Sequence, residues 1–209
     1  MKSEIEEFLR TKLRPALRET IETIAFVIVM VVIIRFFVGE IRWIPSGSMR
    51  PTLVEGDRIF VERVSRFFAT PKRGDVMVFY PPSEPLATDP LAMFERLTGF
   101  FCKDIAYIKR VIGLPGDKIV IKSAPDGKYS VYINGKPLNE KYILSDYDYI
   151  PCNSSMYCGP FTVPKDNYFM LGDNRGNSQD SRFWGFLHKE RFIGHAVILF
   201  WPFTRLNKL

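Results

Sequence analysis

The hydrophobic and polar positions of this chain divide it into two unequal parts. Residues 21–38 form a mostly apolar run, and its centre, Ile24–Ile34, contains no polar side chain. A run of this length just reaches the ~20 residues that cross the hydrocarbon core of a bilayer. Glu22 and Arg35 stand near its ends, where long charged side chains can extend toward water. The pattern predicts an N-terminal transmembrane helix, followed by a folded domain that begins near residue 41.

Two other interpretations of this run stay open. A cleaved leader would need a small-x-small site after the apolar core, and residues 36–40 form a poor one. A helix buried in a soluble core is the second alternative. Basic residues before the run slightly outnumber those just after it, which favours a cytoplasmic N-terminus. We expect residues 1–40 to be a cytoplasmic segment and a single-pass anchor, and residues 41–209 to be an extracytoplasmic domain.

After residue 41 the pattern changes to short runs of Val, Ile, Phe and Tyr separated by glycine and proline. Asn134-Gly135 and recurring Gly-Asp pairs are typical of turns between strands. No helical pattern of about 10–15 residues lies between the runs, which argues against alternating strands and helices. The sequence therefore predicts a mainly β domain of antiparallel sheets, barrel-like in form. The expected strands are 58–61, 76–80, 105–112, 118–121, 129–133, 168–171 and 196–201.

Residues 81–101 interrupt this pattern. They contain four prolines and the stretch Leu91-Ala-Met-Phe-Glu-Arg-Leu97. We expect a surface insertion, whose apolar side chains contact either lipid or the domain itself.

The distribution of charge bears on the partners of the domain. Residues 1–40 carry equal numbers of acidic and basic side chains, so the net charge of +6 lies entirely in residues 41–209. A basic domain tethered to a bilayer suits contact with anionic lipid head groups. No basic cluster interleaved with aromatic residues stands out, so we expect membrane lipids and no nucleic acid as partners.

The cysteines indicate a compartment. Cys152 and Cys158 bracket a short polar loop and could close a small disulfide ring, which would persist only in an oxidising environment. Zinc is the alternative for such a pair, but neither a second cysteine pair nor a nearby histidine completes four ligands. Cys102 is left over and suits a buried apolar position. We expect no metal and no cofactor.

A serine-rich turn offers a nucleophile. Prolines at 45 and 51 enclose Ser46-Gly47-Ser48 and disfavour a helix, and the glycine would let a substrate backbone approach closely. An ordinary turn is the plain alternative. A serine nucleophile needs a base. His188 suits an exposed turn and His195 the start of the last strand, so neither is the favoured base.

Lys109 is a second candidate for the base. It lies in the apolar stretch Ile105–Ile112, with Arg110 on the opposite face of the expected strand. Burial would lower the pKa of this lysine and favour its neutral form, which can accept a proton. A lysine at a strand edge that reaches out to water is the alternative.

The third polar segment, residues 172–182, contains no apolar side chain, and we expect a loop. Its acidic, basic and hydroxyl groups could form an internally hydrogen-bonded scaffold that orients a lysine amine. A solvated surface loop is the alternative, and the spacing of a calcium-binding EF-hand is absent.

Five segments together resemble bacterial type I signal peptidases. They are residues 45–53, 56–61, 73–79, 107–117 and 172–182. They follow the order of that family and lie behind an N-terminal anchor. The resemblance implies a β-rich, membrane-bound serine endopeptidase that removes signal peptides from exported preproteins after small residues, at Ala-x-Ala-like sites.

The resemblance also implies roles for individual residues. Ser48 matches the nucleophile of the family and Lys109 its general base. The matches to supporting groups are Ser46 in the oxyanion hole, Ser178 beside the lysine amine, and the ion pair of Asp180 and Arg182. The candidates for the apolar substrate pockets are Ile44, Met49, Leu53, Tyr107 and Ile108.

The chain departs from the family pattern at Gly176, where members often carry an acidic residue. The resemblance implies a bacterial inner membrane location, with the catalytic domain on the periplasmic side, and we expect a monomer. Two other functions stay open. One is a peptidase dedicated to maturing a single secreted substrate, and the other is a non-catalytic, membrane-tethered domain that binds extended peptides.

Overall fold

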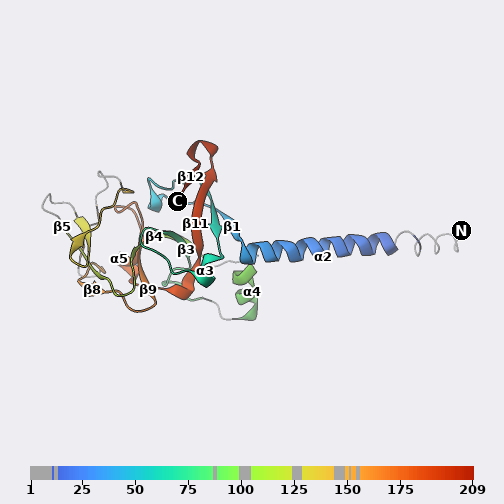
Figure 1. The fold of residues 1–209 in the computed structure, drawn as a ribbon, viewed down its shortest axis with the longest axis horizontal. Coiled ribbons are helices and arrows are strands. Elements are labelled where there is room, and N and C mark those ends of the chain that lie inside the picture. Colours follow the sequence, from blue (N-terminus) through green and yellow to red (C-terminus); the bar gives the residue numbers. More distant parts are fainter. Residues whose placement is uncertain are drawn as a thin grey trace.

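A single long helix, α2 (Arg14–Phe37), projects from a β-rich domain (Figure 1). The computed structural model describes residues 11, 14–86, 89–98, 105–123, 129–143, 149–150, 152–153 and 156–209. The helix begins seven residues before the expected span, and Pro15 lies in its first turn, where the missing N–H has no helical partner to lose. None of its residues is buried. Within the described residues, α2 is the one helix long and apolar enough to cross a membrane.

The larger sheet holds eight strands, and every pairing in it is antiparallel. In spatial order its path is β1 (Gly39–Trp43), β2 (Arg58–Glu62), β11 (Phe192–Trp201), β3 (Val76–Phe79), β4 (Tyr107–Gly113), β9 (Asn167–Leu171) and β10 (Leu187–His188). The eighth strand, β12 (Asn207–Lys208), pairs with β11. The strand β11, from the last part of the chain, thus lies between two strands from the first part of the domain.

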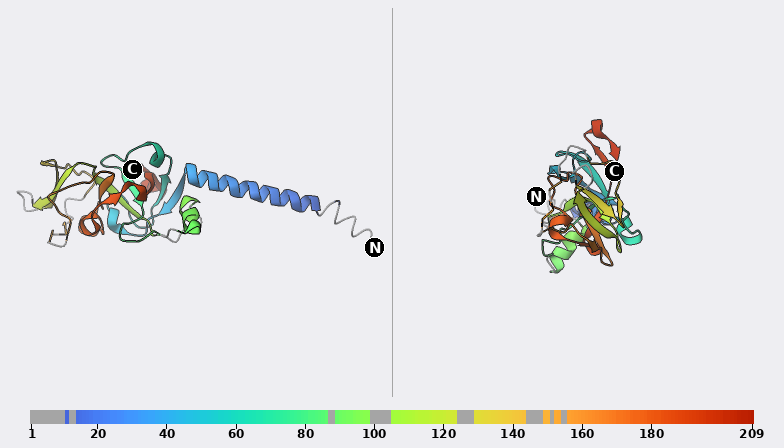
Figure 2. Two further views of the ribbon diagram at one scale, coloured as in Figure 1. Left: turned by 90° about the horizontal axis from the view of Figure 1, so that it is seen from below. Right: turned by 90° about the vertical axis from the view of Figure 1, so that its left-hand side faces the viewer.

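The second sheet lies at the end of the molecule farthest from α2 (Figures 1 and 2). Its order is β7 (Lys136–Pro137), β6 (Tyr129–Ile133), β5 (Lys118–Ser123) and β8 (Phe161–Thr162). Asn134 and Gly135 both have positive φ, as the predicted hairpin turn between β6 and β7 requires. Beside this sheet Cys152 and Cys158 form a disulfide bond, as one of the two interpretations of that pair proposed.

The predicted mainly β, antiparallel fold is confirmed, and each of the seven expected strands overlaps an observed one. Five strands were not expected, namely β1, β7, β8, β10 and β12. Four of these contain two residues each, too few to show an alternating pattern.

Short helices complete the chain. They are α3 (Ser65–Phe68), α4 (Pro90–Thr98), α5 (Ser181–Trp184), and the 3-10 turns η2 (Gly47–Met49), η3 (Lys189–Arg191) and η4 (Phe203–Arg205). The stretch expected to be a surface insertion contains α4, which lies against the end of α2 that joins the domain.

Candidate active site

Ser48 lies on η2, directly after an extended segment that ends at Ser46. Two hydrogen bonds from Asn174 hold the backbone of this turn. The Asn174 N–H donates to Ser48 O at 3.1 Å, and its side-chain amide donates to Gly47 O at 3.0 Å. The Ser46 Oγ lies 3.4 Å from the Ser48 Oγ. The two hydroxyls are therefore neighbours on one turn that the 172–182 loop supports.

Lys109 reaches Ser48 from β4, which is 61 positions away in the sequence. Its Nζ lies 2.8 Å from Ser48 Oγ and donates to Ile108 O at 3.0 Å. The side chain of Arg110 instead pairs with Asp173, as the alternation of a strand requires. The expected juxtaposition of a serine hydroxyl and a lysine amine is present.

The burial of Lys109 makes its neutral form more accessible than that of an exposed lysine. The residue is only 4% exposed. Burial lowers the pKa of Lys109 to about 8, although Asp180 and Asp173 act in the opposite direction. The loss of hydration therefore outweighs the attraction of these two carboxylates, and a substantial fraction of the amine is neutral near pH 8.

The 172–182 loop is packed inside the protein. Asp180 and Arg182 are both fully buried and form a two-pronged ion pair, with Nε–Oδ1 and Nη2–Oδ2 distances of 2.8 Å. Asp180 also accepts a hydrogen bond from the Gly172 N–H at 3.1 Å, and Arg182 donates to Arg175 O at 2.8 Å. The pair therefore joins the two ends of the loop and its middle.

Ser178 lies in this loop but does not make the contact expected of it. Its hydroxyl is buried and has no hydrogen-bond partner among the described residues. The space around it is tight, because a Cβ added to Gly172 would lie 2.2 Å from Ser178 Oγ. The hydroxyl thus remains a free donor and acceptor inside the site.

The sequence analysis assigned no individual partner to several supporting residues, although it included the polar groups of residues 172–182 in one scaffold. Besides Asn174, the fully buried Arg175 pairs with Glu140 and donates to the Tyr149 hydroxyl. Asp173, which pairs with Arg110, accepts a further hydrogen bond from Thr52 at 2.6 Å. The density of polar residues in 172–182 was a signal for Asn174 and Arg175, whereas nothing near Glu140 in the sequence marks it as the partner of Arg175.

A groove of about 380 Å³ lies beside Ser48 and Lys109. Its apolar wall is formed by residues 105–108, and Asn177 and Gln179 add polar groups. Two of the expected pocket residues, Tyr107 and Ile108, line this groove. The other three lie in the hydrophobic core cluster against which Ile108 packs, and they are Ile44, Met49 and Leu53. Their role in substrate binding stays a prediction, now as the support behind the groove wall.

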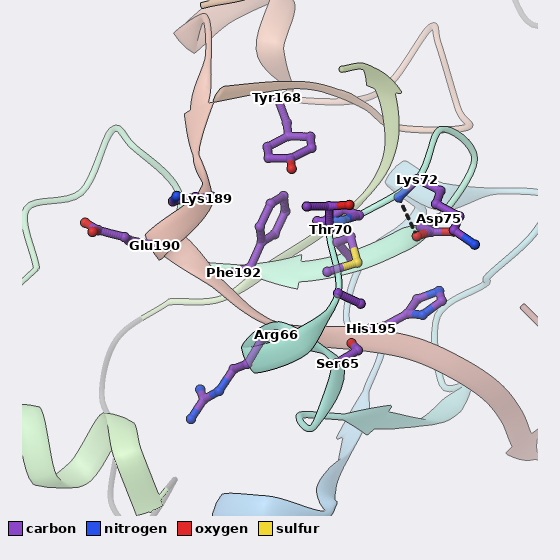
Figure 3. A pocket seen from close by; sticks show the side chains of 13 residues that line it. Ser65, Arg66, Thr70, Lys72, Asp75, Tyr168, Lys189, Glu190, Phe192 and His195 are labelled. Carbon is purple, nitrogen blue, oxygen red and sulfur yellow. Dashed lines mark hydrogen bonds between the residues drawn. The ribbon is translucent and has the colours of Figure 1, made fainter. Parts of the chain in front are cut away.

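A larger cavity, of about 450 Å³, lies apart from this groove and shares no lining residue with it (Figure 3). His195 lines this second cavity, and its Ser65 donates a hydrogen bond to Glu62. His188 stands on β10, 3.6 Å from Glu190. Within the described residues, the nitrogen base that contacts Ser48 is therefore Lys109.

Comparisons with known proteins identify the family of the chain. The family model described as "Signal peptidase, peptidase S26" matches residues 17–201. The chain is 44% identical to "Signal peptidase I" of Leptolyngbya laminosa over 92% of this chain and 84% of that protein. It is 40% identical to "Probable signal peptidase I-2" of Synechocystis, over 90% and 75% of the two chains. A solved signal peptidase I from Enterococcus faecalis is 27% identical, covers 61% of this chain and 97% of its own, and has a TM-score of 0.43. The chain belongs to the signal peptidase family S26, whose members are peptidases that remove signal peptides.

Proposed function

We propose that this chain is a membrane-anchored serine endopeptidase in which Ser48 is the nucleophile and Lys109 the general base. The observation that carries the proposal is the 2.8 Å distance between Lys109 Nζ and Ser48 Oγ, at a lysine that is 4% exposed. A buried amine within hydrogen-bonding reach of a hydroxyl is the arrangement that activates serine without histidine.

The proton path follows from this contact. The neutral amine of Lys109 takes the proton of the Ser48 hydroxyl as Oγ bonds to the carbonyl carbon of the substrate. When the tetrahedral intermediate collapses, the peptide C–N bond breaks and the Lys109 ammonium returns the proton to the leaving nitrogen. An acyl group remains on Ser48, and water activated by the same amine hydrolyses this ester.

The negative charge of the tetrahedral intermediate needs donors beside Ser48. In this proposal the Ser46 hydroxyl, 3.4 Å from Ser48 Oγ, supplies one donor, and the backbone N–H of Ser48 supplies another. Removing one oxyanion donor lowers the rate by ~10²–10³ in hydrolases of this type. Ser46→Ala is therefore expected to lose activity on that scale. The variant is expected to remain folded, because Ser46 is exposed.

Ser178, Asp180 and Arg182 act on the lysine indirectly in this proposal. The buried ion pair holds the loop in place. The free hydroxyl of Ser178 is available to orient the Lys109 amine after that amine has taken the proton of Ser48. Gly176 is exposed, and the proposed mechanism assigns it no role.

The substrate binds as an added strand. β4 pairs with β9 only from Arg110 onward, so residues 105–109 have no partner strand on that side among the described residues. An extended peptide can hydrogen-bond there and direct alternate side chains into the groove. The site accepts small side chains, as in an Ala-x-Ala sequence before the cut bond.

The helix α2 is the single-pass anchor in this proposal, with its N-terminus in the cytoplasm and residues 41–209 on the periplasmic side of a bacterial inner membrane. Its exposed apolar surface supports the anchor, and the Cys152–Cys158 disulfide in the domain supports this orientation. The protein acts as a monomer in contact with membrane lipids, on signal peptides of exported preproteins.

Cleavage of a preprotein by the full-length enzyme in detergent tests the proposal. Ser48→Ala and Lys109→Met are each expected to abolish measurable cleavage at a small-x-small site, since methionine keeps the volume of the lysine stem but cannot accept a proton. Lys136→Met, at an exposed residue of β7, is the matched control and is expected to cleave normally. If Lys109→Met keeps its activity and its free energy of unfolding equals that of the wild type, the proposed dyad is overturned.

A further inference from the structure

The helix α4 has its polar and apolar sides reversed relative to a helix that packs on a soluble domain. Leu91, Met93 and Phe94 are 66%, 53% and 54% exposed. Glu95 and Arg96 are half-buried. A surface helix of a soluble protein ordinarily turns its apolar residues toward the core and its charges toward water. The medium outside α4 is therefore expected to be apolar.

The position of α4 identifies that medium. It lies beside the end of α2 that joins the domain and runs across the direction of that helix (Figures 1 and 2). If α2 crosses a bilayer, a helix at its end that runs across it lies along the membrane surface. An amphipathic helix in that plane places its apolar residues at the boundary between head groups and acyl chains.

Arg63 joins the two helices to the sheet. This residue follows β2 and is only 1% exposed. Its guanidinium donates to Arg96 O of α4 at 2.9 Å and lies 3.5 Å from Arg35 O of α2. It also lies 3.9 Å from the buried carboxylate of Glu40 on β1. One buried cation thus contacts carbonyl oxygens near the C-terminal ends of both helices, which carry partial negative charge.

Aromatic residues extend the apolar surface around this junction. Phe68 of α3 is 86% exposed, and Phe67 packs against Phe36 of α2 with ring centres 5.9 Å apart. The Arg66 guanidinium stands over the Phe36 and Phe67 rings, at 5.5 and 4.5 Å. Aromatic rings with adjacent cations are typical of the membrane–water interface.

We propose that α4 is a second membrane contact, which lies in the interface with Leu91, Met93 and Phe94 in lipid and is held to α2 through Arg63. This inference rests on the proposed anchor function of α2. The lipid contact sets the height of the groove above the membrane, because Arg63 joins α4 to the sheet whose strand β4 lines the groove.

Spin labels on the full-length chain in phosphatidylcholine–phosphatidylglycerol vesicles test the proposal. In a Cys102→Ser background, the variants Met93→Cys, Ile28→Cys and Thr162→Cys each receive a nitroxide at the new cysteine. The collision rates of the nitroxide with oxygen, which concentrates in lipid, and with a water-soluble nickel chelate are then compared. At positions 93 and 28 we expect collisions with oxygen to be more frequent than collisions with the chelate. The chelate is expected to dominate at Thr162, which is exposed on the distal sheet.

The three positions separate the possible failures. A water-accessible label at 93 with a lipid-accessible label at 28 would overturn the α4 contact and leave the anchor intact. Water access at both positions would overturn the anchor and, with it, this inference.

The rate of cleavage supplies a second readout. Met93→Glu is expected to slow processing of a vesicle-bound preprotein on the order of tenfold, with cleavage of a short soluble peptide unchanged. Thr162→Glu is the control. If Met93→Glu lost the same fraction of its cleavage rate on the preprotein and on the soluble peptide, the proposed role of α4 in setting the height of the groove would be contradicted.

Discussion

The most apolar and one of the most polar segments of this protein exchange their usual places. The helix α2 contains no buried residue, although most of its side chains are hydrocarbon. Residues 172–182 contain no apolar side chain, and eight of these eleven residues are buried. The difference shows that burial follows the available partners. The loop satisfies its charges with internal ion pairs and hydrogen bonds, whereas the described parts of the chain leave the apolar side chains of the helix unburied.

Two ion pairs allow a direct test of this contrast. They are the buried pair Arg182–Asp180 and the exposed pair Arg18–Glu22, and both have an arginine Nε–carboxylate distance of 2.8 Å. Arg182→Met removes one partner of the buried pair and leaves Asp180 charged without compensation. We expect the free energy of unfolding to fall by about 3–5 kcal/mol, measured by urea unfolding of the full chain in detergent. The double change Asp180→Leu with Arg182→Met is expected to recover part of that loss. A single-variant loss below about 1 kcal/mol would show that burial does not decide the strength of the pair.

A charge at the centre of α2 tests the other side of the comparison. Ile28→Lys is expected to disfavour membrane insertion by about 2.5–3.5 kcal/mol, because lysine is poorly soluble in hydrocarbon. The measurement is the fraction of chains that insert into membrane vesicles during synthesis, with Ile28→Leu as the control. Normal insertion combined with a destabilised domain would indicate that α2 packs against protein.

The buried amine of Lys109 gives a pH prediction. In the proposed mechanism the neutral amine is the base, so kcat/KM should rise with pH and level off above the pKa of about 8. Below that value the rate should fall about tenfold per pH unit as the lysine becomes protonated. A profile on a short soluble peptide measures this limb without the membrane. A limb near the ordinary pKa of a lysine, about 10.4, would show that burial does not lower the pKa.

The exposed pair of Arg18 and Glu22 in α2 should show the smallest effect. Their side chains are 80% and 62% exposed. Arg18→Met is expected to change the free energy of unfolding by less than about 1 kcal/mol in the same urea experiment, because water and salt screen the pair. A loss comparable to that of Arg182→Met would mean that the two pairs do not differ as their burial predicts.

Local patterns were enough to predict much of this protein. The length of the apolar run predicts α2, and alternating residues between Gly-Asp and Asn-Gly turns predict the main strands. These features depend on neighbouring residues alone, because strand alternation, turn conformation and helix length are properties of short segments. The sequence of α4 was a weaker signal, since its nine residues carry proline at the start and lie in a stretch rich in proline.

The candidate site was predictable only in part. Ser48, Lys109 and the polar loop stand out by composition and by resemblance to a family. Their mutual distances do not, because a contact between residues 61 positions apart depends on how β4 and the serine turn pack. The same holds for Glu140, whose contact with Arg175 spans 35 positions and has no local mark in the sequence.

The sequence by itself thus determined the apolar helix, the strands, their turns and the residue types of the site. Only the tertiary structure decided the place of β11 between β2 and β3, the burial of Asp180 with Arg182, and the outward apolar side of α4. The physical reason is that secondary structure responds to neighbours along the chain. Burial and pKa respond to partners in space, which the chain brings together only when it folds.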